Sequence, residues 1–102
     1  MTKPTEPFDI LPHLKALSQD VLFGDVWENA DLSKRDRSLV TCAMLAALYR
    51  TVELEHHMAR ALDNGVTEKE IRALITHVAF YAGWPCAMNA GRVAVEVLPH
   101  ES

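Results

Sequence analysis

Residues 53–67, ELEHHMARALDNGVT, hold the end of one predicted helix and the start of the next, and they decide the fold class. Asn64-Gly65 is a stop signal, because glycine readily adopts the left-handed conformation that closes a helix. Thr67, with Glu70 three residues later, has the pattern of a capping box that opens the following helix. The segment therefore predicts two helices joined by a tight turn.

Start and stop signals of this kind recur along the chain, and no segment indicates a strand. Pro12 and Pro85 suit the first turn of a helix, where the missing N–H costs little. We predict helices over residues 11–22, 34–49, 53–64, 67–82 and 85–98, with a break at 23–25 and a short turn at 26–27. Thr51 is the predicted cap of the third of these helices. The fold class is all-α: a compact bundle of five to six helices in a single domain (1–102), with an N-terminal helical segment (1–31) and a core (32–98).

The stretch Leu39–Leu48, LVTCAMLAAL, has one threonine and is otherwise apolar. A helix that is apolar all round has no side for solvent, so we expect burial on all sides, at the centre of the bundle or in a subunit interface. The whole chain is 49% hydrophobic, although 102 residues provide few wholly interior positions. Both observations predict an obligate homo-oligomer.

The composition excludes several classes of function. The net charge is −4 with no extended basic cluster, which argues against a nucleic-acid-binding surface. No apolar run reaches the roughly 18 residues of a membrane span, and the N-terminus lacks a signal-peptide pattern. Cys42 and Cys86 form no CxxC motif and are interpreted as core thiols. We expect a soluble, cytoplasmic protein without a membrane partner.

Glu53 and His57 are the main candidates for chemistry, since residues four apart share one face of a helix. Such a pair is either an exposed ion pair or an acid–base pair at the edge of a cleft. His77 and Tyr81 repeat the spacing, where a tyrosine packed with its hydroxyl on a backbone group is the alternative to a functional one. Arg37 is either a salt-bridge residue near a helix start or an anion anchor.

Metal binding is not predicted. Glu53 and His56 form one ExxH unit, but di-iron bundles use two such units with further carboxylates. His56 points about 100° away from His57 and is expected to face solvent.

The segment from Arg37 to Ala90 resembles the carboxymuconolactone decarboxylase family, within the alkylhydroperoxidase-D-like superfamily. The resemblance covers about Leu32 to Leu98, and its marks in chain order are Arg37-Ser38-Leu39, Glu53-Leu54, His57, Asn64-Gly65-Val66-Thr67, Tyr81-Ala82-Gly83-x-Pro85 and Asn89-Ala90. It implies an all-helical subunit that assembles into a ring-like homo-oligomer, a trimer or hexamer.

The peroxidase branch of this superfamily has a CxxC motif four residues before a histidine. Aligning that histidine with His57 places the two cysteine positions at Arg50 and Glu53, so CxxC chemistry cannot operate here. Ser38 stands where that branch has a glutamate. The resemblance therefore favours the decarboxylase branch.

The implied reaction is decarboxylation of a small carboxylated lactone of the γ-carboxymuconolactone type, which needs no metal, pyridoxal or thiamin because the product electrons delocalise into the lactone carbonyl. On this interpretation His57 and Glu53 are catalytic, with Glu53 favouring the imidazolium, while Arg37 and Tyr81 bind the substrate. Two alternatives stay open. One is a peroxiredoxin-like or alkylhydroperoxidase-like antioxidant protein that uses Cys42 or Cys86, and the other is a non-catalytic oligomeric binding protein.

Overall fold

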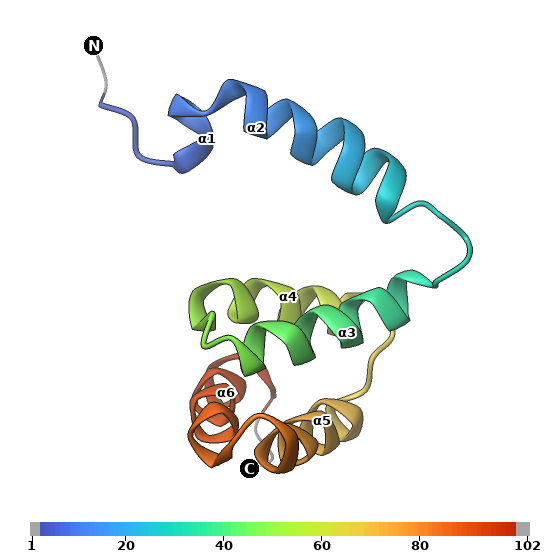
Figure 1. Ribbon diagram of the computed structural model, residues 1–102, viewed down its shortest axis with the longest axis vertical. Helices are drawn as coiled ribbons and strands as arrows, with labels where there is room; N and C mark the ends of the chain where they lie inside the picture. Colours follow the sequence, from blue (N-terminus) through green and yellow to red (C-terminus); the bar gives the residue numbers. More distant parts are fainter. Residues whose placement is uncertain (1–2, 100–102) are drawn as a thin grey trace. The chain divides into compact units, whose positions relative to one another are not determined.

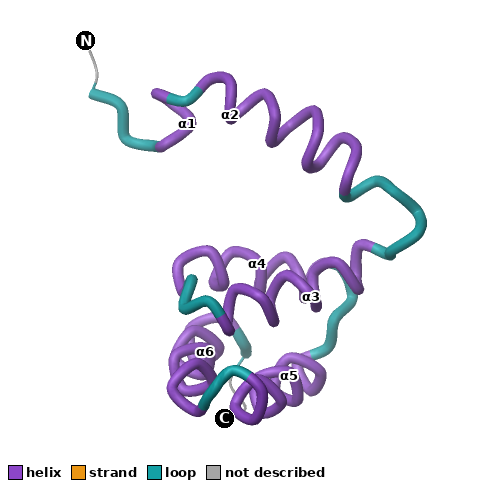
Figure 2. The backbone as a smooth tube through the Cα atoms, in the orientation of Figure 1, coloured by secondary structure: helices purple, strands orange, loops and turns teal. Residues whose placement is uncertain are grey.

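The computed structural model describes residues 3–99, and it is all-helical over this range, as predicted. Its elements are α1 (Pro7–Ile10), α2 (Pro12–Leu17), the π-helix η1 (Ser18–Val26), α3 (Lys34–Ala47), α4 (Thr51–Asp63), α5 (Glu68–Tyr81) and α6 (Trp84–Val97). Figures 1 and 2 show this order. No helix within residues 3–99 is both long enough and apolar enough to cross a membrane. The chain divides into two compact units, with the boundary between Ser33 and Lys34.

The N-terminal unit corrects the predicted break at residues 23–25. The helix continues through this stretch as η1, in which the backbone takes the wider turns of a π-helix. A Cβ atom added to Gly24 would lie 2.9 Å from the carbonyl oxygen of Gln19, which is too close. Glycine therefore permits the wide helix at this point and does not end it. Trp27, directly after η1, stacks obliquely on Phe23 with ring centroids 5.7 Å apart.

The second unit is a four-helix arrangement that contains the predicted core. A connection of three residues folds α3 and α4 into an antiparallel hairpin, and α5 and α6 form a second pair that packs against it (Figure 1). The capping box at Thr67 is confirmed, since Glu70 N donates to Thr67 Oγ1 at 3.1 Å and Thr67 N donates to Glu70 Oε1 at 3.0 Å.

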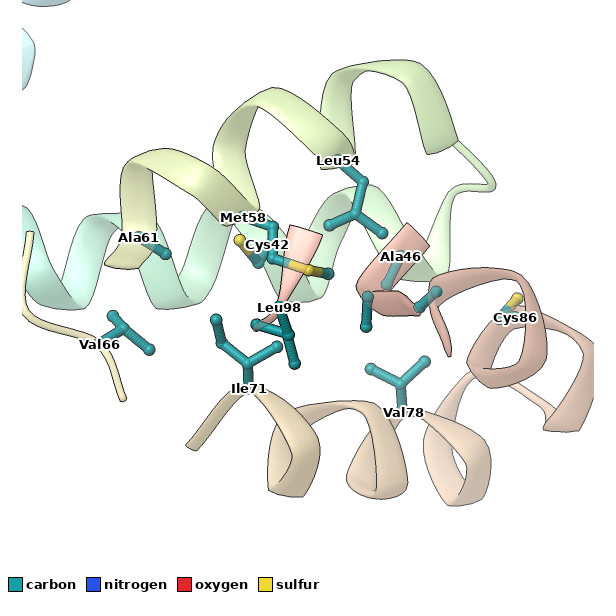
Figure 3. Packing of buried hydrophobic residues seen from close by; sticks show 12 residues of the cluster. Cys42, Ala46, Leu54, Met58, Ala61, Val66, Ile71, Val78, Cys86 and Leu98 are labelled. Carbon is teal, nitrogen blue, oxygen red and sulfur yellow. The ribbon is translucent and has the colours of Figure 1, made fainter. Parts of the chain in front are cut away.

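Buried side chains from all four helices meet between the two pairs. Figure 3 shows Leu54 and Met58 of α4 pointing toward Ile71 and Val78 of α5. The cluster is completed by Cys42, Ala46, Ala61, Val66, Cys86, Ala90, Ala94 and Leu98. Neither cysteine forms a disulfide, and both are buried as the sequence predicted.

The two ends of α4 are set by two turns of the same type. After α4, Val66 N donates to Ala61 O at 2.9 Å and Gly65 has φ 99°. Before α4, Arg50 N donates to Leu45 O at 2.9 Å and Tyr49 has φ 61°. Both are Schellman turns, whose left-handed position favours glycine.

Helix α4 begins earlier than predicted because of the turn at Tyr49. Leu54 N donates to Arg50 O at 2.9 Å, so Arg50 is the N-cap and Thr51 is the first helical residue. The predicted capping role of Thr51 is therefore wrong.

Helix α3 is buried on one side only, although its composition predicted burial all round. Cys42 and Ala46 face the core, whereas Val40, Met44 and Leu48 are about half exposed. The reason is that α4, α5 and α6 cover a single side of α3 within this unit.

Candidate active site

One edge of α4 gathers the polar residues that the sequence singled out. Leu54, Met58 and Ala61 form the buried stripe of this helix. Glu53, His57, Arg60 and Asn64 follow at intervals of four, three and four residues, which places them together along one edge beside the stripe. His57, Arg60 and Asn64 are half-buried, whereas His56 is exposed, as the sequence predicted.

This edge of α4 lies against α3. The Asn64 side-chain amide donates to Ser38 Oγ at 3.0 Å, and Ser38 is completely buried. Arg37 is half-buried near the start of α3, and its carbonyl oxygen accepts the hydroxyl of Thr41 at 2.7 Å. We call the set Ser38, His57, Arg60 and Asn64 the α3–α4 seam; Ser38 is fully buried and the other three side chains are half-buried.

The seam lowers the pKa of His57. Burial is the largest cause, followed by the charges of Arg60 and His56. The sequence predicted the opposite direction, because a carboxylate partner such as Glu53 would favour the imidazolium. With a pKa below the ordinary value of 6.5, the His57 ring is mainly neutral at pH 7. Its Nδ1 atom is inaccessible to solvent.

Glu53 lies one helical turn before His57, with its carboxylate exposed to solvent. The sequence left open whether Glu53 and His57 are an exposed ion pair or an acid–base pair at the edge of a cleft. In the structure His57 is half-buried and Glu53 is exposed. This is the arrangement of a site at the margin of the fold, where a proton from water can reach a partly enclosed imidazole.

Tyr81 does not join this cluster within one chain. It ends α5, is 82% exposed, and stacks on His77 with ring centroids 4.6 Å apart. The alternative of a tyrosine packed on a backbone group is therefore wrong. His77 lines a groove of about 490 Å³ between α3 and α5. We call it the α3–α5 groove, and its walls are Leu39, Val40, Ala43, Glu70, Ala73, Leu74 and His77.

Arg60 is the site residue that sequence reasoning missed. It follows His57 by three residues, so the periodicity that linked Glu53 to His57 also reached Arg60. The signal was present but gave no reason to choose Arg60 over the other exposed-looking charges of α4.

The thiols are poor nucleophiles in this fold. Burial raises the pKa of Cys42 to about 11, so the thiolate is scarce at pH 7. Cys86 donates weakly to the carbonyl oxygens of Ala82 and Ala47, at 3.5 and 3.6 Å. Over residues 3–99, no three side chains of His, Cys, Asp or Glu gather in a way that could hold a metal ion.

Comparison with known proteins agrees with this architecture. The profile of the carboxymuconolactone decarboxylase family matches residues 12–96, so the chain belongs to this family. The match begins earlier than the segment that carried the resemblance, and it includes α2 and η1.

Two curated relatives carry decarboxylase names. The 4-carboxymuconolactone decarboxylase of Acinetobacter baylyi is 44% identical over 75 residues, which cover 74% of this chain and 56% of that protein. The nitrosuccinic acid decarboxylase of Metarhizium robertsii is 38% identical over 68 residues, which cover 67% of this chain and 48% of that protein. The chain therefore spans about half the length of these relatives.

Proposed function

We propose that this chain is a cofactor-free decarboxylase of small carboxylic acids, in which His57 protonates the carbon that loses CO₂. One observation carries the proposal: a half-buried histidine with a lowered pKa lies on the α3–α4 seam, with Arg60 one turn away on the same edge. Perturbed histidines beside a specific charge are typical of catalytic sites.

The names of the two relatives indicate one chemistry. 4-Carboxymuconolactone and nitrosuccinic acid are both carboxylic acids that carry an electron-withdrawing group, a lactone carbonyl in one and a nitro group in the other. When the bond to the carboxylate breaks, its electron pair can move onto an oxygen of that group. A substrate of this kind supplies its own electron sink, and the protein needs to bind, orient and protonate it.

A neutral His57 must take up a proton before it can protonate the product carbon. A bound carboxylate favours the imidazolium, so His57 takes up a proton from solvent when the substrate binds. After CO₂ leaves, the electron pair returns from oxygen to carbon and takes this proton, and the imidazole is neutral again. Glu53, open to solvent one turn away, orients the ring and passes it the next proton. Arg37, half-buried near the start of α3, binds a substrate carboxylate.

We infer that the assembled form is a homo-oligomer, a trimer or hexamer, and that Tyr81 reaches the substrate of a neighbouring copy. Phe80, Tyr81 and Trp84 are 63–82% exposed, and Phe80 and Trp84 meet edge to face at 6.1 Å. We call these three residues the aromatic face. At roughly 150–250 Å² per ring, they expose about 300–600 Å². That already equals the largest apolar patch on a typical monomer, about 300–600 Å².

The test is turnover of both acids, followed by CO₂ release. His57→Gln should lower kcat/KM by at least about 100-fold, the smaller end of general acid–base effects. His56→Gln is the matched control, since it changes the adjacent but exposed histidine, and it should stay within about threefold. Equal activity of the two variants would contradict the role of His57.

A further inference from the structure

Arg60 has a fixed place relative to His57. It lies one turn further along α4, is half-buried on the same edge, and its carbonyl accepts the N–H of Asn64 at 2.9 Å. Asn64 in turn holds Ser38 of α3 through its side chain. The register of Arg60 against α3 is therefore set by hydrogen bonds on the next residue of the same edge.

The charges at the seam suit an anion. Arg60 is a permanent cation one turn after His57, and His57 lies between Glu53 and Arg60 along the same edge of α4. A guanidinium close to a half-buried imidazole disfavours protonation of the ring in the empty site. A bound anion relieves this conflict, because it interacts favourably with both groups.

A cation favours the reaction only if it stabilises the transition state at least as much as the substrate, and this condition determines which carboxylate Arg60 should bind. The carboxylate that leaves loses its charge as it becomes CO₂, so a cation on it would stabilise the substrate more than the transition state. A carboxylate that stays keeps its charge throughout, and a cation can hold it without opposing the reaction.

On the premise of the decarboxylase function, we propose that Arg60 binds the carboxylate that the substrate keeps, and that the site thereby selects dicarboxylic acids over monocarboxylic acids. A guanidinium suits this task, because its planar fork matches a carboxylate with two parallel hydrogen bonds. Arg60 is thus a specificity-determining residue, while His57 carries the proton.

Binding without turnover tests the proposal directly. Succinate and propanoate are titrated into the full chain, with His57 ring signals followed by NMR and heat by calorimetry. The wild type should prefer succinate, and Arg60→Gln should weaken succinate binding about 10- to 100-fold, the range of a lost charge-assisted hydrogen bond. Propanoate affinity should change less than about twofold. Arg60→Lys, which keeps the charge but not the fork, should recover part of the loss.

Kinetics supply the second readout. The kept carboxylate is bound equally in the substrate and the transition state, so Arg60→Gln should raise KM for nitrosuccinic acid and leave kcat nearly unchanged. Arg92→Gln on α6 is the matched control, since Arg92 donates to Asn89 of its own helix at 2.8 Å, and it should change neither constant.

The two proposals fail in different ways. If Arg60→Gln leaves the preference for succinate over propanoate unchanged in a folded protein, the role of Arg60 is wrong, whatever the turnover. If the preference depends on Arg60 but neither acid is turned over, the selectivity for dicarboxylic acids stands and the decarboxylase function does not. A fall in kcat without a rise in KM would also overturn the proposal, because it would place Arg60 on the developing charge.

Discussion

The contacts of α3 with α4 and with α5 are lined by different kinds of residue. The α3–α4 seam is polar and half-buried, and it includes the histidine with a lowered pKa. The α3–α5 groove is mostly apolar and open, and Val40 and Met44 beside it are about half exposed. The polar candidate residues thus gather at the contact of α3 with α4, whereas the groove and the residues near it leave apolar surface of α3 exposed.

The difference shows how an almost wholly apolar helix serves two purposes. Its composition predicted burial on all sides, but a single chain of this size covers only one side of it. The polar side chains of the candidate site come from α4 and from the first two turns of α3, where Arg37 and Ser38 lie. The apolar remainder of α3 is then available for assembly.

The largest expected effect is on the free energy of unfolding, when a core residue beside His57 is truncated. Leu54 is 1% exposed and lies in the buried stripe beside His57. Leu54→Ala should lower the free energy of unfolding by about 2–5 kcal/mol, since it leaves a cavity in the core. Urea denaturation measures the change. Val52→Ala, at an exposed position of the same helix, should cost less than about 0.5 kcal/mol. An equal loss of the free energy of unfolding in the two variants would mean that the buried stripe does not stabilise the helix that carries His57.

The next-largest effect tests whether the aromatic face is an interface. Trp84→Glu places a charge on this face, and tryptophan is enriched among the interface residues whose truncation costs about 2 kcal/mol or more. Analytical ultracentrifugation should show a shift toward monomer, with helical content unchanged. Val52→Glu, also on an exposed apolar residue, should leave the assembly intact. An unchanged sedimentation profile for Trp84→Glu would remove the aromatic face from the interface.

A smaller effect, on kcat/KM, tests whether Tyr81 of one subunit contributes to the site of a neighbouring subunit. Tyr81→Phe should lower kcat/KM about tenfold if a neighbouring copy supplies its hydroxyl, the loss of about one hydrogen bond. Mixed oligomers of Tyr81→Phe and His57→Gln chains should then recover activity, because some sites combine an intact histidine with an intact tyrosine. Full activity of Tyr81→Phe alone would exclude the tyrosine from the site.

The smallest effect is the pH dependence of stability at the seam. The unfolded chain binds a proton on His57 below about pH 6.5, whereas the folded chain binds it only at lower pH. In this window the free energy of unfolding rises with pH, and stability is lost as the pH falls. Denaturation curves at several pH values measure the slope, which His57→Gln should reduce. An undiminished slope in the variant would assign it to other groups.

Local signals predicted the core of this fold well. Asn64-Gly65 and the Thr67 capping box gave the end of α4 and the start of α5, because both depend on a few neighbouring residues. The π-helix was not predictable, since Gly24 suggests a break unless its contact with the Gln19 carbonyl is known. Exposure of one side of α3 depends on how many helices cover it, which no local pattern states.

The candidate site was predictable only in part. Spacing along α4 brought Glu53 and His57 to one edge, and family resemblance added Arg37 and Tyr81. The direction of the pKa shift of His57 depends on burial and on Arg60, which three-dimensional packing determines. The exposure of Tyr81 at the end of α5 likewise depends on how that helix packs.

Tyr49 gives the molecule an optical signal for the contact between α3 and α6. Its pKa is raised, chiefly by interaction with the Cys86 thiol at the start of α6. Ionisation of the phenol changes its ultraviolet absorbance, so an alkaline titration follows this contact without any label. Detachment of α6 from the end of α3 would bring the absorbance change to lower pH, well before the helices themselves unfold.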